Sequence, residues 1–221
     1  MNPLRALSLL ETRVLGVLVE KEKTVPDTYP LSLNALTLGC NQKNNRDPAL
    51  AATEGEVLAA IDELKAASWV IESSGARVTR YSHNVGRVLR VPEQSVALLA
   101  ALMLRGPQTA AGLRAATERL HRFADTSSVE AFLDELAQRP EANGGPLVVL
   151  LPRHPGEREA RWAHLLSGPV QAAEPAQAPA MSRPAPDAPQ GLESRLASLQ
   201  DEVAALRAEL AALRARLDES C

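Results

Sequence analysis

Residues 29–48 read YPLSLNALTLGCNQKNNRDP. Over Leu31–Cys40 the apolar residues recur at i, i+3 and i+7, which is the spacing of one buried helix face, and Pro30 is placed to start that helix. Every side chain of Asn41–Arg46 is an amide or a cation, which suits a polar turn and excludes a core position. The stretch therefore predicts a short buried helix, then a turn, then another helix.

Composition limits the classes of protein that the chain can belong to. It has 221 residues, of which 45% are hydrophobic and 23% charged, and this is enough for one sizeable core or two small ones. The net charge of −3 shows no strong basic excess. No apolar run approaches the roughly 20 residues that span a bilayer, so we expect a cytoplasmic protein. Two cysteines, Cys40 and Cys221, are too few for a disulfide scaffold or a zinc site, and we expect no metal or cofactor.

The chain before residue 91 carries clear start signals for helices. Ser8 with Glu11, and Thr53 with Glu56, are capping boxes that predict helices beginning at those positions. After the second of these helices, two β-prone runs (residues 69–72 and 77–83) flank the sequence SSGA, which is a hairpin signal. Three short helices followed by a hairpin is the order of a winged helix-turn-helix domain.

The same order then recurs, which indicates an internal repeat. A further hairpin is expected from the runs at 147–151 and 159–166. The three helices expected before it cover residues 92–104, 109–120 and 127–139, the last opened by a Ser127/Glu130 capping box. We therefore predict an α+β fold of two tandem winged-helix domains, at residues 1–91 and 92–168.

Beyond residue 168 the composition changes. Residues 169–191 are dominated by Pro, Ala and Gln and predict a disordered linker, and residues 192–221 predict a coiled-coil helix that makes the chain a homodimer. The alternative is one amphipathic helix that folds back on its own domains. The heptad seam consists of Leu192, Leu196, Leu199, Val203, Leu206, Leu210, Leu213 and Leu217.

Several motifs resemble one known family. LETRVLG (residues 10–16), EKE (20–22), YPLSLN (29–34), GCNQK (39–43) and RDP (46–48) are similar to the YceH family of bacterial proteins. The resemblance implies two winged-helix domains and a bacterial cytosolic location. It implies no biochemical activity and carries over no functional residue.

Cations gather around the first predicted wing. Arg77, Arg80 and Arg87 occur there without a carboxylate, and with Lys43 and Arg46 they are the candidate nucleic-acid-binding residues. The alternatives are that Arg77 and Arg80 pair with acids of neighbouring helices, and that Arg46 bonds turn carbonyls or Asp47.

Two functions remain open, because no nucleophile, phosphate-loop or metal pattern predicts an enzyme. The first, which analogy with other winged-helix proteins favours, is a dimeric DNA-binding regulator that uses the basic wing, through weak and salt-dependent contacts to duplex DNA. The second is an adaptor whose winged helices bind a protein partner. Both predicted third helices are rich in carboxylates, and residues 1–91 hold 11 basic and 10 acidic residues, so neither function follows from charge alone.

Overall fold

The first helix begins where its capping box predicts. The computed structural model describes residues 5–74, 78–153 and 156–170, and in it α1 (Leu9–Thr24) has Ser8 as its N-cap. The Glu11 carboxylate accepts a 2.7 Å hydrogen bond from the Ser8 N–H, and Ser8 Oγ accepts one from the Glu11 N–H at 3.2 Å. Thr53 and Glu56 repeat this exchange at the start of α3 (Glu54–Ala66).

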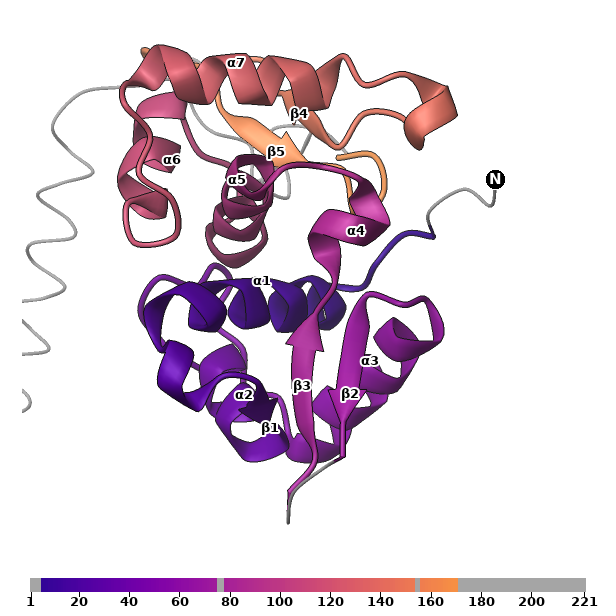
Figure 1. The fold of residues 1–221 in the computed structure, drawn as a ribbon. Helices are drawn as coiled ribbons and strands as arrows, with labels where there is room; N and C mark the ends of the chain where they lie inside the picture. Colours follow the sequence, from indigo (N-terminus) through magenta and orange to yellow (C-terminus); the bar gives the residue numbers. More distant parts are fainter. Residues whose placement is uncertain (1–4, 75–77, 154–155, 171–221) are drawn as a thin grey trace, which may run out of the picture. The chain divides into compact units, whose positions relative to one another are not determined.

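The first half of the chain has the predicted order of helices and hairpin (Figure 1). Its hairpin, β2–β3, is extended by a short third strand, so the sheet order is β1-β3-β2 with all pairs antiparallel. The order fits a winged helix. Besides α1 and α3, the elements are η1 (Pro26–Thr28), β1 (Leu31–Ser32), α2 (Leu33–Cys40), β2 (Val70–Ser73), β3 (Arg80–His83) and α4 (Val85–Leu89).

The structure differs from the sequence analysis at two places. Pro30 does not start a helix: it precedes β1, where Leu31 pairs with Tyr81, and α2 begins only after its N-cap Ser32. After the hairpin the structure has a short helix, α4, for which the sequence analysis made no prediction.

The second half repeats the order of the first. Its last helix, α7, is capped by Asp125 and not by the predicted Ser127/Glu130 box, because Asp125 Oδ1 accepts from both the N–H and the Oγ of Ser128. The elements are α5 (Glu93–Arg105), α6 (Ala110–Thr117), α7 (Thr126–Ala137), η2 (Glu141–Asn143), β4 (Val148–Leu150) and β5 (Trp162–His164). The predicted α+β fold is confirmed.

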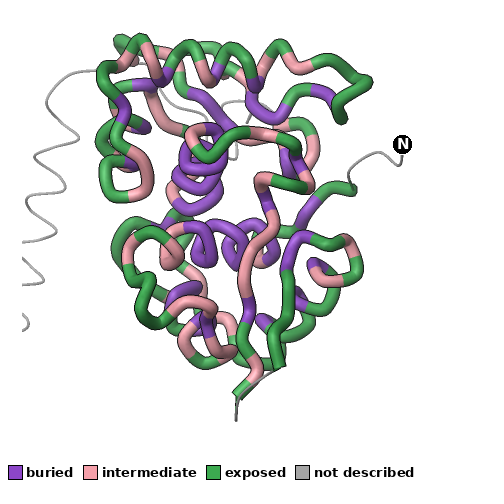
Figure 2. Tube along the Cα trace, viewed as in Figure 1, coloured by how far each residue is buried: buried purple, intermediate pink, exposed green. Residues whose placement is uncertain are grey.

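The two halves meet through α1 and α5. Every residue of α5 from Ser95 to Leu104 is buried (Figure 2), and Gly16 of α1 lies so close to Leu104 that a Cβ on Gly16 would be 2.8 Å from Leu104 Cγ. Residues 1–173 form one compact unit, and the predicted division near Val91 falls within it.

The predicted linker is described only at Pro169 and Val170, and the predicted heptad helix lies outside the described residues. Among the helices of the described ranges, none has the length and apolar character to cross a bilayer.

Candidate functional site

Arg46, one of the candidate nucleic-acid-binding residues, is buried. Its side chain is 0% exposed. The guanidinium donates to the Glu20 carboxylate (2.6 and 3.2 Å), to Gln42 Oε1 (2.9 Å) and to the main-chain oxygens of Gly39 and Asn45. All five N–H donors therefore have an acceptor inside the protein. Arg46 is not available to a phosphate, and its role corresponds to the alternative in which it bonds turn carbonyls.

A second buried arginine, Arg13 of α1, holds the same turn. Its Nη1 donates to the Cys40 carbonyl (3.1 Å) and its Nη2 to the Pro48 carbonyl (2.7 Å). Asn41 also acts here, because its side-chain amide donates to the Ala52 carbonyl and accepts from the Ala52 N–H, at 2.7 and 2.8 Å. These contacts fix the connection between α2 and α3. Sequence reasoning did not single out Arg13, although one cation within an apolar helix face is a signal for such a role.

The other basic candidates do not share one face. Arg80 opens β3, and its guanidinium donates to the main-chain oxygens of Thr28 and Pro30 (3.2 and 2.7 Å). Arg87 is exposed on α4, which follows the opposite end of β3 (Figure 1). Lys43 is exposed in the turn after α2, and Arg77 lies outside the described residues. The expected basic strip is therefore divided between the two ends of the β3–α4 segment.

The third helix of each half presents acids to solvent. On α3 the only cation, Lys65, is engaged by Asp62 and Glu72, and on α7 no cation occurs at all. A helix with this charge would repel the phosphates of a duplex. The exposed charged residues of the two helices are Glu54, Glu56, Asp62 and Glu63 on α3, and Glu130, Asp134 and Glu135 on α7.

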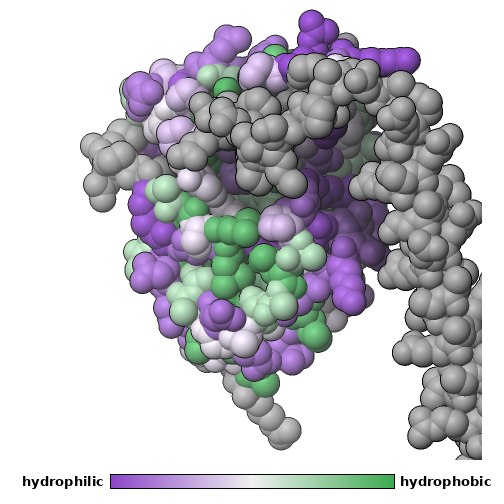
Figure 3. Space-filling view, turned by 180° about the vertical axis from the view of Figure 1, so that it is seen from behind, coloured by the Kyte–Doolittle hydropathy of each residue, from purple (hydrophilic) through white to green (hydrophobic). Residues whose placement is uncertain are grey.

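Large apolar side chains are exposed on the helix pair α2–α3. Leu38 of α2 is 65% exposed and Leu58 of α3 is 37% exposed. Asn34 donates to Glu54 across the two helices (3.1 Å), and each leucine lies one turn after a member of that pair, on the same helix face. Figure 3, seen from behind, shows hydrophobic side chains gathered on one part of the surface. We name the face formed by Asn34, Leu38, Glu54, Leu58 and Asp62 the α2–α3 face.

His83, His164 and Cys40 occupy shielded positions. His83 Nε2 lies 3.2 Å from a Glu22 carboxylate oxygen, and burial lowers the pKa of His83. Burial alone lowers the pKa of His164 to about 4. Burial also raises the pKa of the Cys40 thiol to about 12, which keeps it protonated at neutral pH. No cluster of three or more potential metal ligands occurs in the described ranges.

The α+β fold and the element order of both halves fit the winged-helix class. The family model described as "Protein of unknown function, DUF480" matches residues 7–157. The chain is 68% identical over 177 residues to a UPF0502 protein of Methylibium petroleiphilum, which covers 79% of this chain and 74% of the relative. It is 57% identical over 203 residues to a UPF0502 protein of Acidovorax sp. strain JS42, covering 89% and 90%. The chain belongs to this DUF480/UPF0502 family, which is the YceH family that its motifs resemble.

Proposed function

We propose that this protein is a cytoplasmic, non-enzymatic adaptor that binds another protein through its α2–α3 face. The observation that carries the proposal is the combination of exposed leucines and exposed acids on that face. Exposed Leu38 and Leu58 supply apolar area, and Glu54 and Asp62 supply negative charge. A complementary partner is a basic, amphipathic helix or strand that covers the leucines and pairs with the acids.

Two exposed positions test the adaptor without disturbing the core. Leu38→Ser with Leu58→Ser removes the apolar contact, and Ile71→Ser on β2, which is also exposed (48%), is the matched control. We expect the wild type and the control to retain one stoichiometric protein partner from an extract of the native bacterium, and the double variant to lose it. Binding of the purified partner is then measured by calorimetry. Equal binding by all three proteins would contradict the proposal.

The second candidate is the DNA-binding regulator. It is favoured by the winged-helix order and by Lys43 and Arg87, which are exposed and have no hydrogen-bond or ion-pair partner within the described ranges. Titration with random duplex at low and moderate salt separates the two candidates. The adaptor predicts no salt-sensitive binding. Salt-sensitive binding that Lys43→Glu with Arg87→Glu abolishes would instead support the regulator.

The adaptor is also proposed to act as a homodimer through residues 192–221. The basis is the leucine heptad in the sequence, with Glu202 and Glu209 at g positions facing Arg207 and Arg214 at e positions. Leu206→Pro breaks the predicted helix, so light scattering should give half the wild-type mass. An unchanged mass would contradict the heptad assignment.

A further inference from the structure

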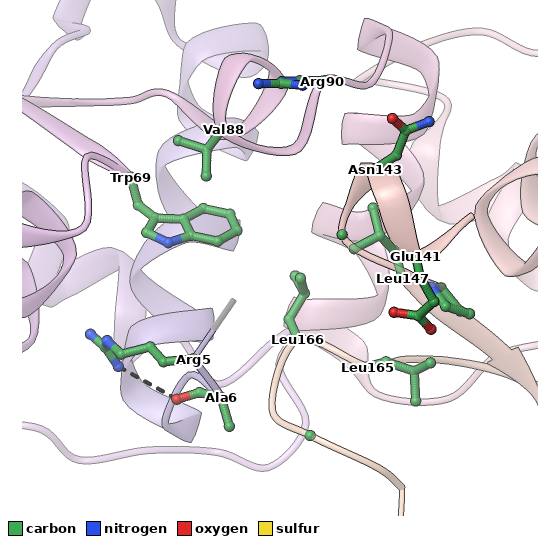
Figure 4. Close-up of a pocket in the computed structure, with 13 residues that line it drawn as sticks. Arg5, Ala6, Trp69, Val88, Arg90, Glu141, Asn143, Leu147, Leu165 and Leu166 are labelled. Carbon is green, nitrogen blue, oxygen red and sulfur yellow. Dashed lines mark hydrogen bonds between the residues drawn. The ribbon is translucent and has the colours of Figure 1, made fainter. Parts of the chain in front are cut away.

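A pocket of about 590 Å³ lies between the two halves of the compact unit, on the side of α4 (Figure 4). The first half contributes Arg5, Trp69 and the end of α4, and the second half contributes η2 and the chain on either side of the β4–β5 hairpin. The volume is within the range of pockets that hold small organic molecules. None of the contacts described for the α2–α3 face involves this pocket.

Trp69 supplies an unused hydrogen-bond donor. The residue is only 3% exposed, it lines the pocket, and its indole N–H has no acceptor among the described residues. Figure 4 shows the indole nitrogen on the ring edge that faces Arg5 and Ala6. The indole N–H is not among the sealed, unpartnered polar atoms of the described residues, so it opens into the pocket and can donate to a ligand acceptor beside this ring edge.

Two charged side chains of opposite sign line the pocket without an ion-pair partner among the described residues. Arg5 is engaged by the Glu11 carboxylate (3.0 Å from Nη1). Arg90, at the end of α4 with φ +55°, and Glu141 of η2 have no hydrogen-bond or ion-pair partner within the described ranges. Figure 4 places these two residues on different sides of the pocket. The lining can therefore receive a negative group at Arg90 and a positive group at Glu141.

A second arginine reinforces the positive end. Arg139 donates through Nη2 to the carbonyls of Leu89 and Asn143, but its Nη1 is buried and has no acceptor. Burial and then the nearby charge of Arg90 lower the pKa of Arg139. Arg139 does not line the pocket and its free Nη1 is buried, so it adds positive potential behind Arg90 but donates no hydrogen bond to a ligand.

Apolar side chains form the wall between the charged ends. Val88, Leu147 and Leu166 face the pocket together with the Trp69 ring (Figure 4). They would cover the apolar side groups of a ligand whose ends are charged.

We propose that this pocket binds a short apolar peptide of two or three residues with free termini. Its carboxylate pairs with Arg90, its ammonium with Glu141, a peptide carbonyl accepts from the Trp69 N–H, and its side chains lie against Val88, Leu147 and Leu166. A single amino acid has adjacent charges and no peptide carbonyl, so it fits the separated charges and the additional donor less well. This site is independent of the proposed adaptor function.

The test uses Trp69 as its own reporter. The full chain has two tryptophans, so Trp162→Phe leaves Trp69 as the only indole. Titration with leucyl-leucine should give a saturable change in Trp69 emission. Arg90→Gln and Glu141→Gln should each weaken binding on the order of tenfold, the effect of losing one charge-assisted contact. Arg87→Gln, the exposed arginine of α4 that does not line this pocket, is the control and should bind as the parent does.

Three results would overturn the proposal. The first is the absence of a saturable change up to the millimolar range in a chain whose circular dichroism is unchanged. The second is equal binding of leucyl-leucine blocked at both termini, which shows that the charges are not used. The third is an effect of Arg90→Gln without an effect of Glu141→Gln, which shows an anion site and not a peptide site. Calorimetry with the otherwise unmodified chain checks that Trp162→Phe did not create or destroy binding.

Discussion

At the scale of single residues, the amides and cations after α2 serve the fold. Arg46 and Asn41 satisfy main-chain groups of their own turn and of Ala52, and Arg13 reaches the turn from α1. Arg46 is a buried charge that is paired and fully hydrogen-bonded, whereas Arg13 bonds two carbonyls and leaves its Nε without an acceptor. The turn between α2 and α3 is therefore fixed by side chains from three places in the sequence.

Removal of the Arg46 guanidinium should be costly. Arg46→Met removes the buried partner of Glu20, which is 17% exposed and keeps only the more distant Lys21 ammonium at 3.4 Å, and breaking a buried ion pair costs about 3–5 kcal/mol. Lys43→Met, in the same turn but exposed, should change the free energy of unfolding by no more than about 0.5 kcal/mol. Urea unfolding measures both. Similar values for the two variants would show that the Arg46 contacts do not stabilise the fold.

His164 should make stability fall on mild acidification. Its pKa is about 4 in the folded chain and 6.5 in the reference state, so between these values the unfolded chain binds the proton and the folded chain does not. The stability that the neutral His164 imidazole gives the folded chain is complete above pH 6.5. It is lost as the pH falls toward 4, and the free energy of unfolding then decreases by up to about 1.4 kcal/mol per pH unit. Urea midpoints at pH 7 and pH 5 should differ less in His164→Gln than in the wild type. An unaltered difference would exclude His164 as its source.

At the scale of elements, α2 lies unusually close to α1. A Cβ on Gly39 would lie 2.5 Å from Val17 Cγ1. Val17 is fully buried, and a β-branched side chain has little freedom to move away. The absence of a side chain at Gly39 thus permits the approach that brings the Cys40 carbonyl to Arg13.

Two glycine substitutions should have opposite effects. Gly39→Ala forces Val17 to move and should destabilise the fold by about 1–3 kcal/mol. Gly55→Ala on α3, where an added Cβ meets nothing within 4 Å, should stabilise by up to about 1 kcal/mol through helix propensity. Thermal unfolding of both variants gives the comparison. If Gly39→Ala left the unfolding temperature unchanged, α1 and α2 would have room to separate.

The elements that sequence reasoning predicted well are those that local interactions determine. Ser8 and Thr53 are satisfied by residues three positions away, so their capping boxes could be read directly. Pro30 was misplaced because Leu31 pairs with Tyr81, fifty residues later. The burial of Arg46 could not be deduced because its partner Glu20 lies on another helix. Sequence patterns discriminate least among charged residues, since identical residue types serve a turn and a ligand.

At the scale of the whole molecule, α5 is the shared centre of the described unit. It contacts α1 on one side and α6, α7 and β5 on others (Figure 1). A helix that is buried all round belongs to an interior. The repeated order of elements therefore does not imply two independently stable bodies.

Both halves should consequently unfold together. Leu104→Ala, at the contact with Gly16, creates a cavity between α1 and α5 and should cost about 2–5 kcal/mol. Urea unfolding followed by Trp69 alone and by Trp162 alone, in the two tryptophan-to-phenylalanine backgrounds, should shift by the same amount. A shift seen by only one tryptophan would indicate that the halves unfold separately.

The buried thiol of Cys40 makes the opening of the core around α2 measurable. The side chain is 0% exposed and its thiol stays protonated at neutral pH, so an alkylating reagent can modify it only after the core around α2 opens. In a Cys221→Ser background, the rate of Cys40 labelling would then measure how often that core opens under native conditions. The same measurement on Arg46→Met or Gly39→Ala would separate substitutions that loosen the turn locally from those that destabilise the whole chain.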